Sequence, residues 1–355
     1  MPAPPRVVPV SLHPQQRVQA MDVNASLQQS GADLLQTHAQ VLYFAHHTTA
    51  GFVEPLPENP FPDQRAVRDH VEPFRTLFPF GADYKHDEMD RRRELSPQQR
   101  ECEPRNADAH LVYIGAGLTP CASYPAAPDR PVYLLDLDGV NQDTGRQRLR
   151  RVTALGFTTE QQVSSASISV PSQRATSVGL RDPRFGLFDT LYAHLARHEV
   201  QYGRIRLQVS STTGAALTVN EYEPLLMEQD LERALQSPRC FQRKSATVYS
   251  NSHSNSHENQ GASGGNRHTS APIKQPFASG RPPRPATASG VDSNSRGDSN
   301  HALLDLRDYV DLMVVPDEQN QQGRIVQGRY QSPILLRSAS APATVQVRAS
   351  IYRCV

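Results

Sequence analysis

The same order of sequence patterns occurs twice in this chain of 355 residues, on either side of a polar stretch at 158–177. In the first half, a helix-like segment (26–40) leads into a strand-like one (41–45), and residues 187–203 lead into 204–210 in the same way. A turn rich in Thr and a helix-like run then follow in both halves. Such recurrence indicates one structural unit used twice. We therefore predict a first domain at 1–157, a linker at 158–177 and a second domain at 178–355.

Each half also ends in two strand-like segments separated by turn residues. Residues 131–139 and 148–157 form this pair in the first half, and residues 332–337 and 343–352 form it in the second. Alternating polar and apolar residues bounded by Gly, Asn, Asp and Pro are typical of β-hairpins. Combined with the helix-like runs, they predict an α+β fold of mainly antiparallel sheets with packed helices.

Composition excludes several classes of function. The formal net charge is +1, so the basic surface expected of a nucleic-acid-binding protein is missing. No segment approaches the roughly 18 apolar residues of a membrane helix, and the four cysteines form no CxxC pair. We expect a cytoplasmic protein with no nucleic-acid or membrane partner. Residues 250–300 are so poor in large apolar side chains that they predict a disordered insertion in the second domain.

His47, Thr48 and Thr49 directly follow the strand-like segment 41–45, and Ala50-Gly51 come next. Small hydroxyl residues and glycine allow close approach of a ligand to the backbone, and such a turn can hold a phosphate. A strand end with a satisfied histidine is the alternative interpretation.

Two further histidines lie in segments that suit chemistry. His86 precedes Asp87, and a carboxylate beside an imidazole can orient the ring and raise its basicity. His110 precedes an apolar run. Together with His47 they are a possible ligand set for an open metal site that keeps a position for water or substrate. Alone, the charged loop around His86 is equally typical of a solvated surface.

The combination of these segments resembles the YjbQ family of small α+β proteins, described as secondary thiamine-phosphate-synthase-type enzymes. His47-Thr48-Thr49-Ala50 is similar to the family's HT[ST]A stretch, and Glu58-Asn59 to a displaced form of its NEN element. Tyr84-Lys85-His86-Asp87 is similar to its Y-x-HD loop, and Ala109-His110 to its SH element. The resemblance covers roughly residues 10–157 of the first copy.

The second copy carries the complementary pieces. Asn220-Glu221 resembles the family's NE pair, and Gln331 ends the G-x-[WY]-Q element that the first copy lacks. Thr212, however, stands where the first histidine belongs. Two interpretations stay open: the copies form one composite site from the histidines of the first and Asn220, Glu221 and Gln331 of the second, or the second copy is a degenerate structural partner.

The resemblance implies a metal-assisted enzyme that acts on a phosphorylated small molecule, with thiamine-phosphate-synthase-like transfer as one form of that chemistry. In this interpretation His47, His86 and His110 bind a divalent metal (Zn, Mn or Mg), Asp87 orients a histidine, and the remaining residues contact substrate or phosphate: Thr48, Thr49, Glu58, Asn59, Asn220, Glu221 and Gln331. The family resemblance also implies a homo-oligomer, as a trimer. The alternative is a non-catalytic metal- or metabolite-binding scaffold whose insertion recruits partners.

Overall fold

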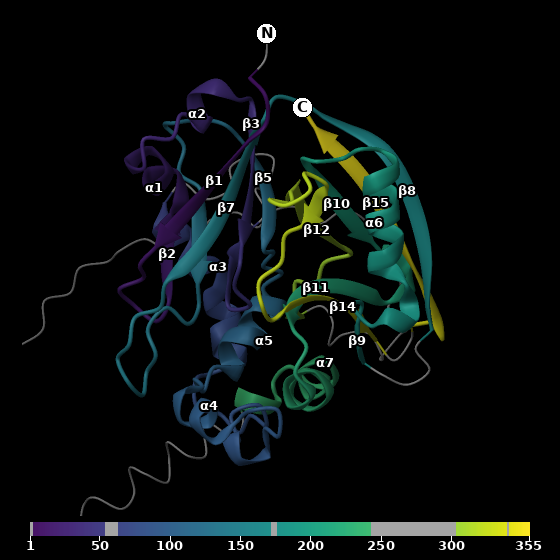
Figure 1. Ribbon diagram of the computed structural model, residues 1–355. Coiled ribbons are helices and arrows are strands. Elements are labelled where there is room, and N and C mark those ends of the chain that lie inside the picture. Colours follow the sequence, from purple (N-terminus) through teal and green to yellow (C-terminus); the bar gives the residue numbers. More distant parts are fainter. Residues whose placement is uncertain (1–2, 54–62, 172–175, 243–302, 339–340) are drawn as a thin grey trace, which may run out of the picture.

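Figure 1 shows the computed structural model, which describes residues 3–53, 63–171, 176–242, 303–338 and 341–355. Glu58, Asn59 and the predicted insertion at 250–300 lie outside the described residues. The first half contains β1 (Arg6–Leu12), β2 (Gln19–Asp22), α1 (Val23–Gln29), α2 (Leu34–Thr37), β3 (Gln40–Ala45), β4 (Ala50–Phe52), α3 (Gln64–Leu77), η1 (Met89–Arg91), α4 (Pro97–Cys102), α5 (Ala107–Gly115), β5 (Cys121–Pro125), β6 (Tyr133–Asp136) and β7 (Arg150–Phe157).

The second half follows without a break in strand structure. It contains β8 (Glu160–Pro171), β9 (Ser177–Gly179), η2 (Pro183–Phe185), α6 (Leu187–Arg197), β10 (Gly203–Gln208), η3 (Ser211–Thr213), β11 (Ala215–Glu221), η4 (Leu225–Asp230), α7 (Leu231–Gln236), β12 (Tyr309–Pro316), β13 (Gly323–Ile325), β14 (Gln331–Arg337) and β15 (Thr344–Cys354). The predicted α+β class is confirmed. The helix-like runs also form helices, because α3 and α6 carry apolar residues at helical spacing that become buried.

The two halves have the same strand order. In the first, β1-β7-β3-β5 form one antiparallel sheet and β2-β6-β4 a smaller one. In the second, β8-β15-β10-β12 follow the same sequence of neighbours, with β13 added at the edge, and β9-β14-β11 repeat the smaller sheet. The two halves thus share the neighbours of each strand in both sheets, apart from the added β13.

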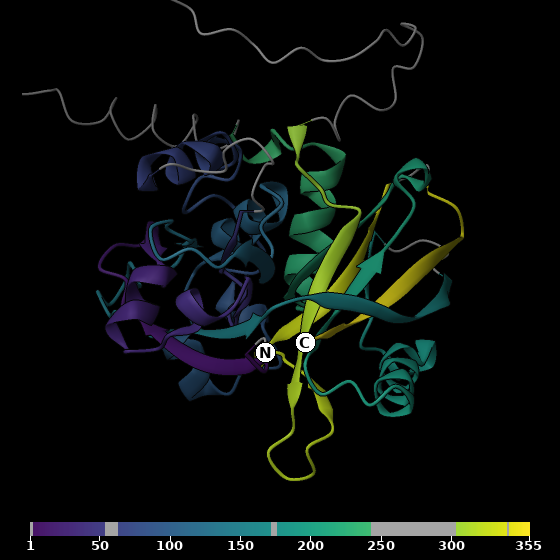
Figure 2. The ribbon, with the colours of Figure 1, turned by 90° about the horizontal axis from the view of Figure 1, so that it is seen from above.

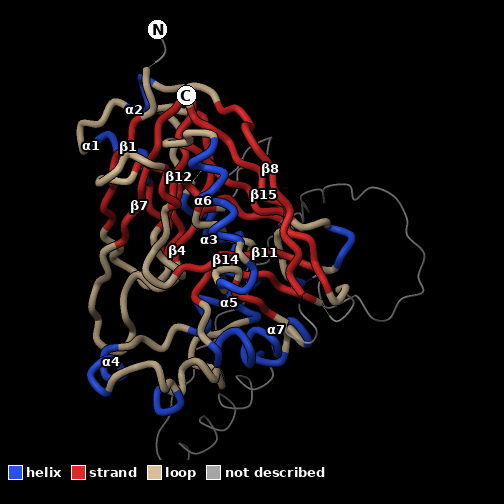
Figure 3. Tube along the Cα trace, turned by 45° about the vertical axis from the view of Figure 1, so that its right-hand side comes forward, coloured by secondary structure: helices blue, strands red, loops and turns tan. Residues whose placement is uncertain are grey.

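The sheets of the two halves face each other in the middle of the molecule, with α1 and α2 on one outer side and α6 on the other (Figures 1 and 2), and Figure 3 shows α6 in front of the strands. The larger sheets share an apolar core that includes Leu42, Phe44 and Leu155 from the first half and Met313 and Val315 from the second. A second shared core joins the smaller sheets to α3, α5 and α7. The halves are therefore held together by burial of apolar surface, and not only by the connection between them.

The predicted hairpins are wrong. β6 pairs with β2 and β4, and β7 pairs with β1 and β3, so consecutive strands lie in different sheets. β14 and β15 are separated in the same way. Only an isolated bridge between Val140 and Gln147 forms in the first of these turns. Turn residues thus mark where the chain reverses, but they do not decide which strands become partners.

The predicted linker is also wrong for most of its length. Glu160–Pro171 forms β8, which pairs with β15 along its whole length and is the edge strand of the larger sheet. Its residues are mostly exposed, and only Ile168 and Val170 are buried. An edge strand with one open side needs few apolar residues, which explains its linker-like composition.

Among the described residues, no helix combines the length and the apolar character needed to cross a membrane.

Candidate functional site

The turn after β3 is held in place by two side-chain amides of the second half. The Gln331 side-chain amide donates to the carbonyl oxygens of Ala45 (2.8 Å) and His47 (2.9 Å). The Asn220 amide donates to the carbonyl of Thr48 (3.0 Å). Asn220 is the next-to-last residue of β11 and Gln331 is the first of β14, two strands that pair with each other. Their register places both residues at the same end of this strand pair, where their amides reach the turn.

His110 lies on α5, a helix buried on all sides, and its ring is fixed by the second half. Nδ1 of His110 lies 2.7 Å from Oδ1 of Asn220, an oxygen that also accepts the backbone N–H of Glu221. Since this oxygen can only accept, Nδ1 of His110 carries the proton and Nε2 carries a lone pair. Nε2 faces the Glu221 carboxylate at 4.0 Å.

His86 is positioned by the same kind of contact between halves. The backbone N–H groups of Lys85 and His86 each donate to the carboxylate of Asp230, at 2.9 Å. Asp87 accepts from Nδ1 of His86 (3.0 Å) and from the N–H of Ala107 at the start of α5 (3.1 Å). Asp87 thus links the His86 ring to the start of α5, and the rings of His86 and His110 lie 5.4 Å apart.

Nε2 of His86 is occupied by a cation of the chain itself. Nη1 of Arg92 lies 3.1 Å from it, and the guanidinium lies between His86 and the carboxylates of Glu94, Glu103 and Glu221. Arg92 is 2% exposed, whereas the sequence around it reads as a solvated charged loop.

Burial controls the charges in this region. It lowers the pKa of His86 to about 3, with Arg92 acting in the same direction, and lowers that of His110 well below its usual value. It also lowers the pKa of His47 to about 3. For Glu221, burial raises the pKa to about 7. Near neutral pH the imidazoles are therefore neutral, and Glu221 can exchange a proton.

A pocket of about 410 Å3 opens beside these groups. Its walls combine the turn at 46–49, His110 and Glu221 with residues 146–149 of the loop before β7 and Arg150, the first residue of β7. Arg150 is buried against Asp136, at 2.6 Å, and its guanidinium reaches Oγ1 of Thr49 (3.4 Å). We call this space the composite pocket, because both halves line it.

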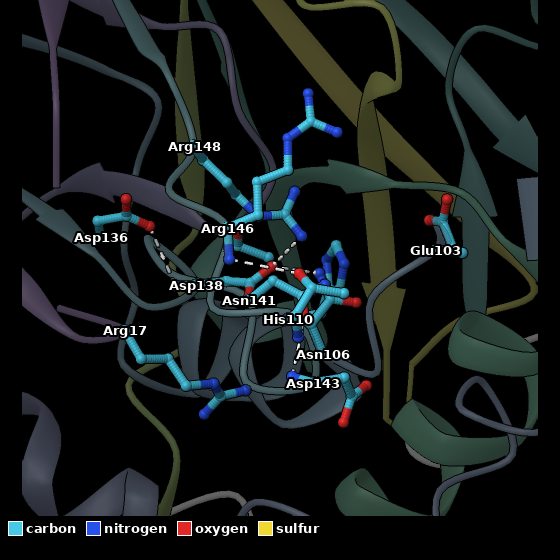
Figure 4. A network of polar contacts seen from close by, with 12 residues as sticks. Arg17, Glu103, Asn106, His110, Asp136, Asp138, Asn141, Asp143, Arg146 and Arg148 are labelled. Carbon is cyan, nitrogen blue, oxygen red and sulfur yellow. Dashed lines mark hydrogen bonds and ion pairs between the residues drawn. The ribbon is translucent and has the colours of Figure 1, made fainter. Parts of the chain in front are cut away.

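Two arginines of the composite pocket remain accessible. Arg148 pairs with Asp138 at 2.8 Å but keeps 30% of its side chain exposed, and Arg146 is exposed beside it. Figure 4 shows both near Asn106 and His110. Asn106 donates to Asp138 (2.8 Å), while its own buried Oδ1 has no hydrogen-bond partner among the described residues. The pocket therefore offers the guanidinium groups of two arginines to a ligand.

The predicted metal ligands do not assemble. Nε2 of His47 accepts the backbone N–H of Arg151 (2.9 Å), and both ring nitrogens of His86 are engaged. Within the part of the chain that the structure describes, no three His, Cys, Asp or Glu side chains are arranged to hold a metal ion. The residues present therefore do not fit the divalent metal that the resemblance implies.

Sequence reasoning named His47, His110, Asn220, Glu221 and Gln331, which the structure brings together. It missed the buried Arg92 and Asp230. Asp230 had a signal, because it is four residues after Leu226 and four before Ala234, on the apolar side of its helical run. Nothing in the local pattern distinguishes Arg92 from its exposed neighbours Arg91 and Arg93.

No protein-family model matches this sequence, and no curated protein matches it. Among solved structures, a hypothetical protein of Aeropyrum pernix K1 is similar at 22% identity, covering 43% of this chain and 99% of its own, with a TM-score of 0.29. A YbjQ-like protein of unknown function from Sulfolobus solfataricus P2 is 16% identical and covers 44% of this chain and 99% of its own, with a TM-score of 0.29. An uncharacterized conserved protein of the yjbq family from Clostridium acetobutylicum is 21% identical and covers 41% of this chain and 97% of its own, with a TM-score of 0.26. The chain thus has YjbQ-like structural neighbours over less than half of its length.

Proposed function

We propose that this chain binds a phosphorylated small molecule in the composite pocket. The observation that carries the proposal is the pairing of accessible Arg146 and Arg148 with the turn containing Thr48 and Thr49 across one cavity. Guanidinium groups match the geometry of phosphate oxygens, and hydroxyl groups supply further donors. Arg150 does not contribute directly, because Asp136 already holds it; its contact to Thr49 orients the turn.

Binding of inorganic pyrophosphate, followed by calorimetry, tests this proposal. The double variant Arg146→Ala/Arg148→Ala should weaken binding by at least about tenfold, since two charge-assisted contacts are removed. Arg130→Ala is the matched control, because Arg130 is an exposed arginine outside the pocket lining. Equal affinity in the wild type and the double variant would contradict the proposal.

A second candidate function is proton transfer on the bound molecule. It is favoured by the lone pair on Nε2 of His110, which faces Glu221 at the pocket wall. The two groups are 4.0 Å apart, so a ligand atom or a water molecule placed between them would lie within hydrogen-bond reach of both, as general acid–base catalysis requires. Thiamine-phosphate-synthase-like transfer is the specific reaction to assay, because the resemblance implies it.

The assay supplies a pyrimidine diphosphate and a thiazole phosphate and follows product formation. Glu221→Gln and His110→Asn should each abolish turnover while leaving pyrophosphate bound. Pyrophosphate binding without turnover of any phosphorylated substrate would favour the non-catalytic binding function. Light scattering of the same samples checks the trimer that the resemblance implies.

A further inference from the structure

Arg92 is the one arginine among the largest fully buried side chains of the described residues. It directly follows η1, and its neighbours Arg91 and Arg93 are exposed. Burying a guanidinium costs several kcal/mol unless ionic partners and hydrogen bonds replace the lost water. The buried position of Arg92 is therefore stable only if neighbouring groups neutralise and hydrogen-bond its guanidinium.

The surroundings of Arg92 are groups that commonly bind metal ions. Nη1 lies 3.1 Å from the unprotonated Nε2 of His86 and 3.6 Å from Oε1 of Glu103. Nη2 lies 3.5 Å from Oε1 of Glu221, and Nε donates to Glu94 at 2.7 Å. A neutral imidazole nitrogen and carboxylate oxygens are the usual ligands of Zn²⁺.

The hydrogen bonds of His86 also resemble those of a histidine that binds a metal ion. Asp87 accepts from Nδ1, so the proton is on that nitrogen and Nε2 presents its lone pair. A carboxylate behind a histidine is the arrangement that commonly orients a metal ligand. Here the lone pair receives an N–H of Arg92 instead.

We propose that Arg92 is a built-in cation that takes the place of a metal ion between His86 and Glu221. The guanidinium neutralises the carboxylates that face it and blocks the lone pair of His86. The site consequently keeps its geometry without a metal. This inference does not depend on which ligand the composite pocket binds.

Calorimetric titration of the full, metal-free chain with Zn²⁺ tests the proposal. The wild type should show no Zn²⁺ site that His86→Ala removes. Arg92→Ala frees Nε2 of His86 and releases the carboxylates of Glu94, Glu103 and Glu221 to move toward it, so it should bind Zn²⁺ at least about tenfold more tightly than the wild type. The double variant Arg92→Ala/His86→Ala should lose this gain. Arg93→Ala is the matched control and should behave as the wild type, because Arg93 is exposed.

Two results would overturn the proposal. One is a Zn²⁺ site in the wild type that disappears in His86→Ala, and the other is a folded Arg92→Ala variant, verified by circular dichroism, that gains no such site. If Arg92→Ala does not fold, a Zn²⁺ site in the wild type that His86→Ala removes would still overturn the proposal. Pyrophosphate affinity is measured separately, so failure of the proposed ligand would be distinguishable.

Discussion

The two halves share their strand order but differ at the turn after the third strand. In the first half this turn carries His47, Thr48 and Thr49 and is clamped by amides of the second half. Its counterpart, η3 with Thr212, lines a separate pocket of about 380 Å3 whose wall includes Leu235 and Leu304. The same strand order therefore places the two turns in different pockets. The chemical character of each pocket depends on the side chains that line it.

Asn220→Ala should have the largest effect on the contact between the two halves at this turn. It removes the partners of His110, Thr48 and the N–H of Glu221, which are then left without hydrogen bonds, at a cost of about 4 kcal/mol. Both the free energy of unfolding and pyrophosphate affinity should fall, as measured by urea denaturation and calorimetry.

Asn24→Ala is the matched control for Asn220→Ala. Asn24 is equally buried, but it bonds to Arg130 and Tyr43 within the first half. Its loss should lower stability while pyrophosphate affinity stays unchanged. If both variants weaken binding equally, the pocket does not depend on the contact between halves.

Glu221→Gln should change how stability depends on pH. Burial raises the pKa of Glu221 to about 7, against about 4.3 in an unfolded chain. Between about pH 4 and 7 the Glu221 carboxyl is therefore protonated in the folded state but ionised in the unfolded state. As the pH rises through this range, the free energy of unfolding of the wild type decreases. The variant should remove this decrease and be more stable above pH 8 by about 4 kcal/mol. Identical stability profiles from pH 4 to 9 would contradict the shift.

Gly328→Ala should disturb the clamp by a smaller amount. An added Cβ would lie 2.2 Å from the carbonyl oxygen of His46 and 2.8 Å from Oε1 of Gln331. We expect a loss of about 2 kcal/mol, measured by thermal unfolding, because backbone must move. Gly179→Ala is the control, since its Cβ would meet only the Tyr222 ring at 3.1 Å, and it should cost less.

Thr212→Ala should have the smallest effect. Thr212 occupies the place of the first histidine in the second half, but it is exposed and bonds only to Ser210. Stability should change by less than about 0.5 kcal/mol, and pyrophosphate affinity should stay the same. A clear loss of affinity would show that the second turn also contributes to binding.

Local sequence patterns predicted the positions of helices and strands better than they predicted which strands pair. The runs that became β3, β10 and α6 were visible because their apolar spacing follows directly from burial. Strand pairing was not visible, since β6 and β7 meet partners more than a hundred residues away. β8 was missed because an exposed edge strand has the composition of a linker.

The site was predictable where a residue type is unusual for its surroundings. The histidines could be named from such contrasts, and the Asn220-Glu221 pair from the family resemblance. The burial of Arg92 could not, since it depends on four groups from separate segments meeting at one point. Only the tertiary structure decides which member of a charged run loses its water.

The clamp on the turn after β3 also sets an order of events during synthesis. Gln331 bonds to a carbonyl that lies 284 residues earlier in the chain. At 5–20 residues per second, a ribosome needs roughly 15–60 s to make that interval. Until Gln331 is made, the turn after β3 lacks this bond, and His110 lacks Asn220 for the shorter interval of 110 residues that separates the two in the chain. A nascent first half can thus bury its own core, but ligand recognition must wait for translation to reach the end of the second.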